Sequence, residues 1–156
     1  MIITATETDG PQVCDIAARA GNFSQEEVEC VAELWEEYLT DGPDTCGYNF
    51  IVDRDGDQVL GFACYGPRPM TEGVFDLYWV AVDPNVRCKG VGRALLTASE
   101  DAAREQGGRM LVAETSGTAT YDSTRKFYYA MGYESESIIK DFYSIGDDLF
   151  IFIKRF

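Results

Sequence analysis

The order of hydrophobic and polar positions predicts about seven strands and about four helices. Short runs rich in aromatic and β-branched residues, separated by Gly, Pro and Asp, are typical of strands. They fall over residues 2–6, 48–52, 59–65, 75–82, 110–114, 133–140 and 149–154. Apolar residues at helical spacing predict helices over residues 11–20, 24–39, 93–106 and, from 120 or 122, to 131. We therefore expect one mixed α/β domain over residues 1–156.

The second predicted helix begins with a capping pattern. Ser24 is followed three residues later by Glu27, and such a pair satisfies free N–H groups at a helix N-terminus. In the same helix, the spacing of Trp35 and Tyr38 favours packing in the core. Further on, the acidic segment 53–57 has the spacing of the start of a calcium loop. No Glu stands at the twelfth loop position, so a hairpin turn is expected there.

A strand, a glycine-containing loop and a helix follow one another at the centre of the chain. An Asp-Pro pair stops the strand, because proline lacks an N–H, and a stretch of good helix formers follows the loop. Gly90 and Gly92 let the backbone approach an anion closely, where the free N–H groups and the dipole of the helix favour negative charge. Three cations add to this field, Arg87, Lys89 and Arg93. The stretch predicts a phosphate-binding site.

Two short signatures indicate which phosphate ligand is expected. The loop is neither a P-loop nor a Rossmann fingerprint, because it lacks G-x-x-x-x-G-K-[ST] and a third glycine. Residues 87–92, R-C-K-G-V-G, resemble the R/Q-x-x-G-x-G/A signature of the GNAT superfamily of N-acetyltransferases. About forty residues later, residues 127–133, F-Y-Y-A-M-G-Y, resemble the Y-x-x-x-G-F/Y signature of that family. The two together, in a strand–helix–strand–helix context, are far more specific than either alone.

The resemblance covers nearly the whole chain and implies a fold and a co-substrate. The implied fold is a largely antiparallel sheet of about seven strands flanked by about four helices, with the fourth and fifth strands splayed apart. The implied co-substrate is acetyl-CoA, with its pyrophosphate on the loop and its pantetheine arm in the gap between those strands; no metal is implied. The residues implied at the cofactor are Val80, Ala81, Val82, Arg87, Cys88, Lys89, Gly90, Val91, Gly92 and Arg93. The family also places its first two helices beside the acceptor entrance, which is the alternative role for Trp35 and Tyr38.

Three residues are candidates for proton transfer. Tyr128 stands at the position of the family's general-acid tyrosine, and a phenol stays protonated at neutral pH. Tyr129 is offset by about 100° on the helix and is expected to point elsewhere. Asp76 lies on the strand where similar enzymes carry a Glu base, and Glu114, at the end of the following strand, is the competing candidate. A salt-bridged role fits either carboxylate equally well, and ordered water is the third route in the family.

Acidic and aromatic residues gather near the C-terminus, in a segment, 141–148, that we expect to be a loop. In similar enzymes this place borders the acceptor site, and carboxylates beside aromatic faces suit a cationic amine. A solvated acidic turn is the alternative. The candidate acceptor-binding residues are Asp141, Phe142, Tyr143, Asp147 and Asp148. The acceptor expected is a small-molecule or peptide amine, such as a polyamine, an amino acid, an aminoglycoside or a protein amine.

Composition restricts which classes of partner, and which groups for proton transfer, are expected. The net charge of −14 argues against nucleic acid or an anionic membrane as a partner, because both are repelled. Five scattered cysteines without a C-x-x-C pair favour free thiols and a cytoplasmic protein. No apolar run approaches the roughly 20 residues of a membrane span, and no signal-peptide pattern is present. Because there is no His, proton transfer must use Tyr, Cys, a carboxylate, Lys or water.

The sequence thus predicts an acetyl-CoA-dependent N-acetyltransferase that acts on a primary amine by direct attack. Two alternatives share the same loop: an N-acyltransferase that uses a longer acyl-CoA, and a non-catalytic domain that binds or senses coenzyme A. A nucleophilic route through Cys88 is disfavoured, because that residue is expected to face the phosphates. A homodimer is compatible with the resemblance.

Overall fold

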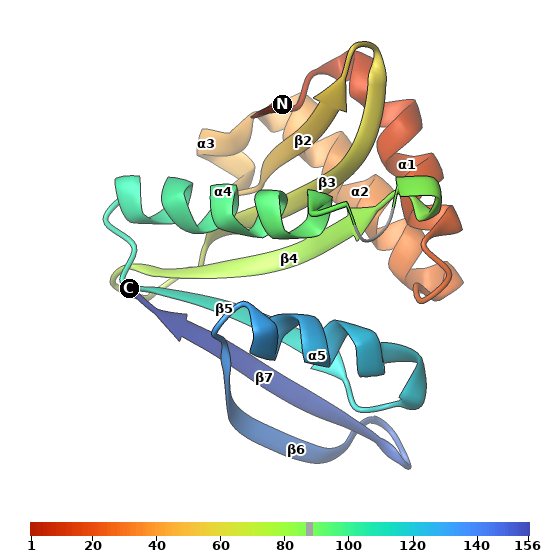
Figure 1. Ribbon diagram of the computed structural model, residues 1–156. Helices are drawn as coiled ribbons and strands as arrows, with labels where there is room; N and C mark the ends of the chain where they lie inside the picture. The colour runs from red at the N-terminus through yellow and green to blue at the C-terminus, as the bar shows by residue number, and fades with distance from the viewer. Residues whose placement is uncertain (87–88) are drawn as a thin grey trace.

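A sheet of seven strands runs through the molecule in the order β1-β2-β3-β4-β5-β7-β6 (Figure 1). The computed structural model describes residues 1–86 and 89–156. The strands are β1 (Ile2–Thr4), β2 (Asn49–Asp55), β3 (Gln58–Pro67), β4 (Val74–Val82), β5 (Met110–Ser116), β6 (Glu134–Ser144) and β7 (Asp147–Arg155). Of the neighbouring pairs in the described chain, β4 and β5 run parallel and the others antiparallel. The predicted mixed fold with a largely antiparallel sheet is confirmed.

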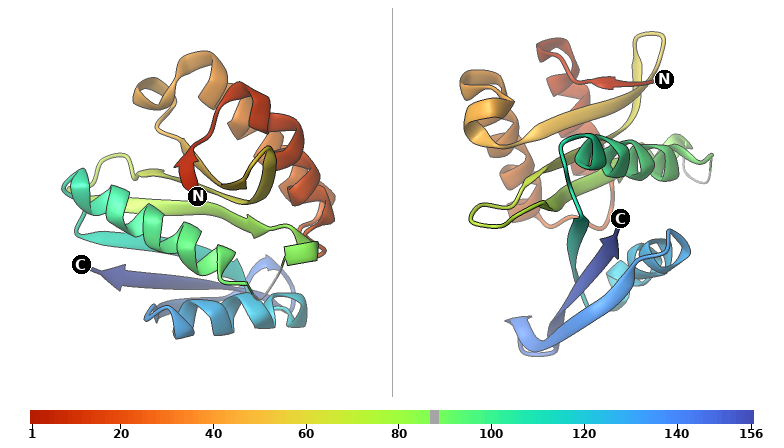
Figure 2. Two further views of the ribbon diagram at one scale, coloured as in Figure 1. Left: turned by 45° about the horizontal axis from the view of Figure 1, so that its top comes forward. Right: turned by 90° about the vertical axis from the view of Figure 1, so that its left-hand side faces the viewer.

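Helices cover both faces of this sheet (Figure 2). The α-helices are α1 (Gly10–Arg19), α2 (Gln25–Asp41), α3 (Pro43–Cys46), α4 (Val91–Glu105) and α5 (Asp122–Ala130), and the 3₁₀ helices are η1 (Glu7–Asp9), η2 (Pro84–Val86) and η3 (Ala119–Tyr121). The helices α1 and α2 lie on one face, and α4 and α5 on the other. The single turn α3 was not predicted from the hydrophobic pattern. None of the helices in the described ranges is long and apolar enough to cross a membrane.

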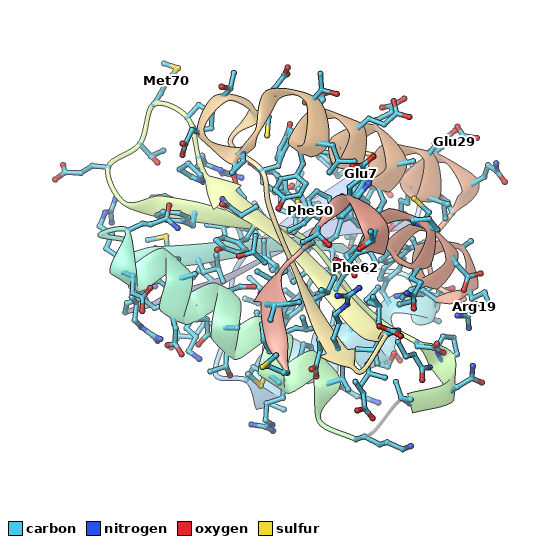
Figure 3. All side chains as sticks on the ribbon, turned by 90° about the horizontal axis from the view of Figure 1, so that it is seen from above. Glu7, Arg19, Glu29, Phe50, Phe62 and Met70 are labelled. Atoms are coloured by element: carbon cyan, nitrogen blue, oxygen red, sulfur yellow. The ribbon has the colours of Figure 1, made fainter. Side chains whose placement is uncertain are left out.

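Alternating residues of the sheet supply two hydrophobic cores, one under each helical layer. Phe50 and Phe62 are fully buried beneath α1 and α2 (Figure 3). Trp35 packs edge-on against Phe50, with ring centroids 5.0 Å apart, so the interpretation of Trp35 as a core residue is confirmed. Under α4 and α5, Leu95 and Phe152 belong to the second core. Because helices pack on both faces of the sheet, its middle strands are held in place and can support a site.

Two local predictions in the N-terminal half are confirmed by hydrogen bonds and pairing. At the start of α2, the backbone N–H of Ser24 donates to Glu27 Oε2 at 2.7 Å, and the N–H of Glu27 donates to Ser24 Oγ at 3.1 Å. This is a complete capping box. The acidic segment 53–57 is a hairpin turn, because β2 and β3 pair antiparallel down to Asp55 and Gln58.

The strands β4 and β5 separate along their length, as the resemblance implied. They pair from Val74 to Leu77 on β4 and from Met110 to Ala113 on β5. On the other edge of β4, Tyr65 of β3 pairs with Leu77, and the preceding Cys64 pairs with Trp79, so Tyr78 is the extra residue of a β-bulge. Since a bulge bends a strand and increases its twist, β4 diverges from β5 beyond this point (Figure 1).

The C-terminal segment 141–148 differs from the predicted loop. It forms the turn end of a β-hairpin, in which β6 extends to Ser144 and β7 begins at Asp147. The pairing is irregular between Ile139 and Ser144. Here the carboxylate of Asp148 accepts the N–H of Asp141 at 3.0 Å, which replaces a bond of the strand ladder. The acidic residues that suggested a loop therefore stabilise a distorted pair of strands.

Candidate active site

A cavity of about 630 Å³ lies where β4 ends and α4 begins. Its other walls come from α5 and from the connection between α1 and α2. Val80, Ala81 and Val82 line it together with Gly90, Val91, Gly92 and Arg93, so these predicted cofactor residues are brought to one place. Lys89 precedes them and is not in the lining, and Arg87 and Cys88 lie outside the described residues. We call this cavity the donor pocket.

The start of α4 presents free backbone donors to the donor pocket. The first N–H of this helix that bonds back along the chain is that of Ala94, to the carbonyl oxygen of Gly90 at 2.9 Å. The N–H groups of the three residues before it have no intrahelical acceptor, as at every helix N-terminus. Gly90 has a φ of +87°, a left-handed conformation that favours glycine. The sequence G-V-G therefore forms the turn that points these donors at the pocket.

Gly92 sits where a side chain would narrow the donor pocket. A Cβ atom at this position would lie 3.4 Å from Val82 Cγ2 and 3.7 Å from Phe127 Cζ. These are ordinary contact distances, so a methyl group is tolerated but a larger side chain must extend into the cavity between β4 and α5. The glycine leaves the backbone accessible to a bulky anion.

Cations without an internal partner gather around the donor pocket. Lys89, Arg93 and Lys126 form no ion pair with any described residue. In a chain with 27 acidic and 13 basic residues, a cation that remains unpaired is unusual. Arg93 lines the pocket itself and Lys89 directly precedes its lining, whereas Lys126, on α5, is exposed and lies outside the lining. Together with the free N–H groups, Arg93 and Lys89 suit a negatively charged ligand.

The free edge of β4 forms one side of the donor pocket. On its other edge, Val80 pairs with Ala63 and Val82 with Gly61 of β3. On the β5 side the described pairing stops at Leu77, so the backbone of the following residues is free on that edge. Unpaired strand groups can bind an extended ligand as a further strand would.

A second cavity, of about 850 Å³, adjoins the donor pocket. The two share lining residues, namely Gly21, Asn22, Val80, Thr120 and Thr124. Its walls come from the start of α2, the bulged part of β4, the end of β5, the segment around η3 and α5, and the hairpin of β6 and β7. We call it the acceptor cavity. A ligand that passes through the donor pocket along β4 reaches the acceptor cavity at Val80.

Comparison with known proteins agrees with this geometry. The family described as Acetyltransferase (GNAT) family matches residues 12–133. A search of curated proteins gave no match. The chain belongs to the GNAT family of acetyltransferases. It is therefore an enzyme of the acyltransferase class, as the two signatures predicted.

Solved structures of other GNAT proteins share the fold over nearly their whole length. A GNAT-family protein from Desulfovibrio desulfuricans is 40% identical, with a TM-score of 0.96 over 99% of this chain and 98% of that one. A ribosomal-protein-alanine N-acetyltransferase from Brucella melitensis is 25% identical, with a TM-score of 0.77 over 100% and 99% of the two chains. A Salmonella typhimurium protein, solved with its cofactor acetyl-CoA, is 18% identical, with a TM-score of 0.78 over 99% and 92%.

The two tyrosines of the second GNAT signature lie in different surroundings. Tyr128 is 5% exposed and lines the acceptor cavity. Burial raises the pKa of its phenol, so the hydroxyl is protonated at neutral pH. Tyr129 is 53% exposed, lines neither cavity and packs edge-on against Phe152. The expected divergence of the two side chains is confirmed.

Both predicted base candidates bind the same arginine. Arg68 donates from Nε to Asp76 Oδ2 at 2.9 Å, and its Nη2 lies 2.8 Å from Asp76 Oδ1. The same Nη2 lies 3.2 Å from Glu114 Oε1. Asp76 therefore has both carboxylate oxygens engaged, and it does not line the acceptor cavity, whereas Glu114 does. The structure places Glu114 closer to an acceptor than Asp76.

The five predicted acceptor-binding residues divide into two groups. Tyr143 and Asp147 line the acceptor cavity, and Asp147 Oδ1 accepts a hydrogen bond from Ser116 Oγ at 2.6 Å. The other three lie outside the lining and have other contacts. The Asp148 carboxylate pairs with the Lys140 ammonium at 2.6 Å, Asp141 accepts the N–H of Gly146, and Phe142 is 53% exposed against the ring of Tyr143.

Glu27 and Tyr121 are site residues that sequence reasoning missed. The Tyr121 hydroxyl lies 2.7 Å from Glu27 Oε1 and 2.8 Å from Oε2, and both residues line the acceptor cavity. Burial and the Glu27 carboxylate raise the pKa of Tyr121, so it remains a neutral donor. The capping box indicated a structural role for Glu27. No local pattern connects it to a tyrosine 94 residues away in the chain.

Proposed function

We propose that this GNAT enzyme transfers an acetyl group from acetyl-CoA to a primary amine of a cationic acceptor, by direct attack. One observation carries the proposal: the site consists of two adjoining cavities of opposite charge. The donor pocket has free N–H groups and unpaired cations, and the acceptor cavity has carboxylates. An anionic donor and a cationic acceptor are thereby directed to the two sides of Val80.

The residues of the donor pocket fit coenzyme A. The N–H groups at the start of α4, with Lys89 and Arg93, suit a pyrophosphate, and the free edge of β4 suits the amides of a pantetheine arm. When bound, acetyl-CoA supplies the acetyl group as a thioester. The structural neighbour from Salmonella typhimurium, solved with acetyl-CoA, supports this assignment.

The acceptor cavity is acidic because most of its carboxylates lack an internal cation. Four carboxylates line it, on Glu26, Glu27, Glu114 and Asp147. In the described part of the chain only Glu114 among these forms an ion pair, with Arg68. The other three have no described cation beside them. An acceptor that carries positive charge gains from this field, and an acidic acceptor is repelled.

Direct attack requires a base for the acceptor amine and an acid for the departing sulfur, and the chain has groups in place for both. The acceptor ammonium loses one proton before attack. As the new C–N bond forms and the C–S bond of the thioester breaks, the nitrogen loses a second proton, which replaces the one given to the sulfur. Glu114, directly or through water, is the proposed acceptor of the amine proton. The Tyr128 hydroxyl is the proposed donor to the departing sulfur, which leaves as a thiol.

A release assay for free coenzyme A thiol, with panels of amines and acyl donors, tests the proposal. We expect turnover with acetyl-CoA and amines that carry net positive charge, and little with amines of net negative charge. A preference for a longer acyl-CoA would contradict the acetyl assignment. Tight coenzyme A binding by calorimetry without turnover on any amine would instead support a sensor.

A further inference from the structure

Glu27 occupies an unusual position for a capping residue, because it faces the acceptor cavity. It lies in the first turn of α2, and its carboxylate accepts a hydrogen bond from Tyr121, the last residue of η3. Both residues line the acceptor cavity, and neither lines the donor pocket. The junction of the two cavities at Val80 is where the acetyl group is expected. Glu27 and Tyr121 are thus available to a part of the acceptor other than its reacting amine.

The Glu27 carboxylate has neutral donors as partners and has room for another hydrogen bond. Its partners are two neutral donors, the N–H of Ser24 and the hydroxyl of Tyr121. No described cation forms an ion pair with it. A carboxylate offers about four lone-pair sites, and the phenol oxygen offers two more. An ammonium group, with three N–H donors, fits the acceptors that remain.

A further observation points to a cation in this part of the cavity. Burial is the largest cause of the raised pKa of Tyr143, and the charges of Glu114, Asp147 and Glu27 raise it further. Carboxylates from β5, β7 and α2 thus act on one place. Their combined negative potential favours a cationic group there.

We infer that Glu27 and Tyr121 form a subsite for a second ammonium group, and that the preferred acceptor is an aliphatic diamine or a longer polyamine. One amine is acetylated at Val80 while the distal ammonium binds the Glu27 carboxylate and the Tyr121 oxygen. The inference rests on the proposed acetylation of amines. It adds a specificity residue, Glu27, that binds the acceptor without taking part in the proton transfers.

Steady-state kinetics with two acceptors of equal length test the subsite. The probes are 1,5-diaminopentane and 5-amino-1-pentanol, which differ in the charge of the distal group. We expect the wild-type enzyme to favour the diamine about tenfold or more in kcat/KM, through KM, since a charge-assisted hydrogen bond is worth about 1.5–3 kcal/mol. Glu27→Gln should raise KM for the diamine about tenfold with little change in kcat, and should raise KM for the amino alcohol much less.

The variants are chosen so that an effect on the fold can be distinguished from an effect on acceptor binding. Gln also serves at the third position of a capping box, so Glu27→Gln preserves the start of α2. Glu29→Gln is the matched control, because it removes the same charge from the same helix at an exposed site away from the cavity (Figure 3). Tyr121→Phe, which leaves the carboxylate in place, should raise KM for the diamine by no more than about threefold.

Several results would overturn the subsite. They are equal kcat/KM values for the two acceptors with the wild-type enzyme, equal effects of Glu27→Gln and Glu29→Gln, or a larger loss in Tyr121→Phe than in Glu27→Gln. None of these results would contradict the proposed acetylation of amines. Absence of turnover with both acceptors, and with every other amine, would contradict the proposed function and the subsite together.

Discussion

The donor pocket and the acceptor cavity meet at Val80 and Thr124, yet they are assembled in different ways. Half of the residues that line the donor pocket come from one stretch, the end of β4 and the start of α4. The acceptor cavity takes its walls from elements spread between Gly21 and Asp147. A short local motif therefore specifies the first, whereas only the complete fold brings the second together.

Their charges differ as well. The acidic chain pairs most of its described cations with carboxylates but leaves Lys89 and Arg93 unpaired beside the donor pocket. Around the acceptor cavity it leaves carboxylates without cations instead. Because like charges within one site repel, these groups are retained at a cost in stability. The contrast supports the proposal of an anionic donor and a cationic acceptor.

A negative charge introduced into the donor pocket should have the largest effect, on the affinity for coenzyme A. Gly92→Glu places a carboxylate between Val82 and Phe127, where the pyrophosphate is expected. Like charges in contact cost several kcal/mol, so we expect coenzyme A affinity to fall by about 100-fold or more. Isothermal titration calorimetry on the folded variant measures this loss.

Gly92→Gln separates charge from size, because the two side chains have nearly the same volume. A steric effect alone would weaken coenzyme A binding equally in both variants. Affinity that is unchanged in Gly92→Glu would refute the assignment of the donor pocket, whatever the behaviour of the glutamine variant.

Removing the proposed proton donor should have the next largest effect. Tyr128→Phe keeps the ring in its contacts with Tyr133 and Phe152 and deletes only the hydroxyl. We expect kcat to fall about 100-fold, the range of a lost general acid, with little change in coenzyme A affinity. Tyr129→Phe is the control, since its exposed hydroxyl lies outside both cavities. Equal effects of the two substitutions would argue against Tyr128 as the acid.

The contrast between the two cavities also explains what the sequence could predict. Gly90, Gly92 and Tyr128 were found because each falls in a short continuous signature, the first two in one strand–loop–helix unit and the third in one helix. The seven strands were found from runs of aromatic and β-branched residues separated by Gly, Pro and Asp. The loop expected over 141–148 was wrong because Asp148 and Asp141 bond to the backbone of a hairpin, which composition does not reveal.

The acceptor cavity was only partly predictable for the same reason. The capping box by itself explains why a Glu stands at position 27. The contact of Glu27 with Tyr121 depends on how two segments that are distant in the sequence pack together. Likewise, Asp76 and Glu114 were both plausible bases from their strands. Their common partner Arg68, at the end of β3, became visible only in three dimensions. Long-range pairs of this kind leave no local periodicity.

The base assignment predicts a smaller effect that depends on pH. We expect Glu114→Gln to lower kcat/KM about tenfold at low pH and less as the pH approaches the pKa of the amine, because a neutral amine needs no base. Asp76→Asn should lower the rate by the same factor at every pH and reduce the free energy of unfolding by about 1 kcal/mol, since Arg68 loses its bidentate partner. The reverse pattern would identify Asp76 as the base. Unchanged rates in both variants would leave ordered water as the acceptor of the amine proton.

The smallest expected effect concerns one cation of the donor pocket. Arg93→Gln removes a charge that lines the pocket and has no ion pair in the described chain. A single exposed charge contributes roughly 1 kcal/mol, so Kd for coenzyme A should rise about three- to tenfold. Salt screens such a charge, and the Debye length is already about 10 Å at 0.1 M salt. The difference in Kd between the variant and the wild type should therefore be smaller at about 500 mM NaCl than at about 50 mM NaCl. Lys140→Gln is the control, because it changes the net charge equally but lies on β6, paired with Asp148. If both variants weaken coenzyme A binding to the same extent, the net charge of −14 acts on the ligand as a whole and the local role of Arg93 is refuted.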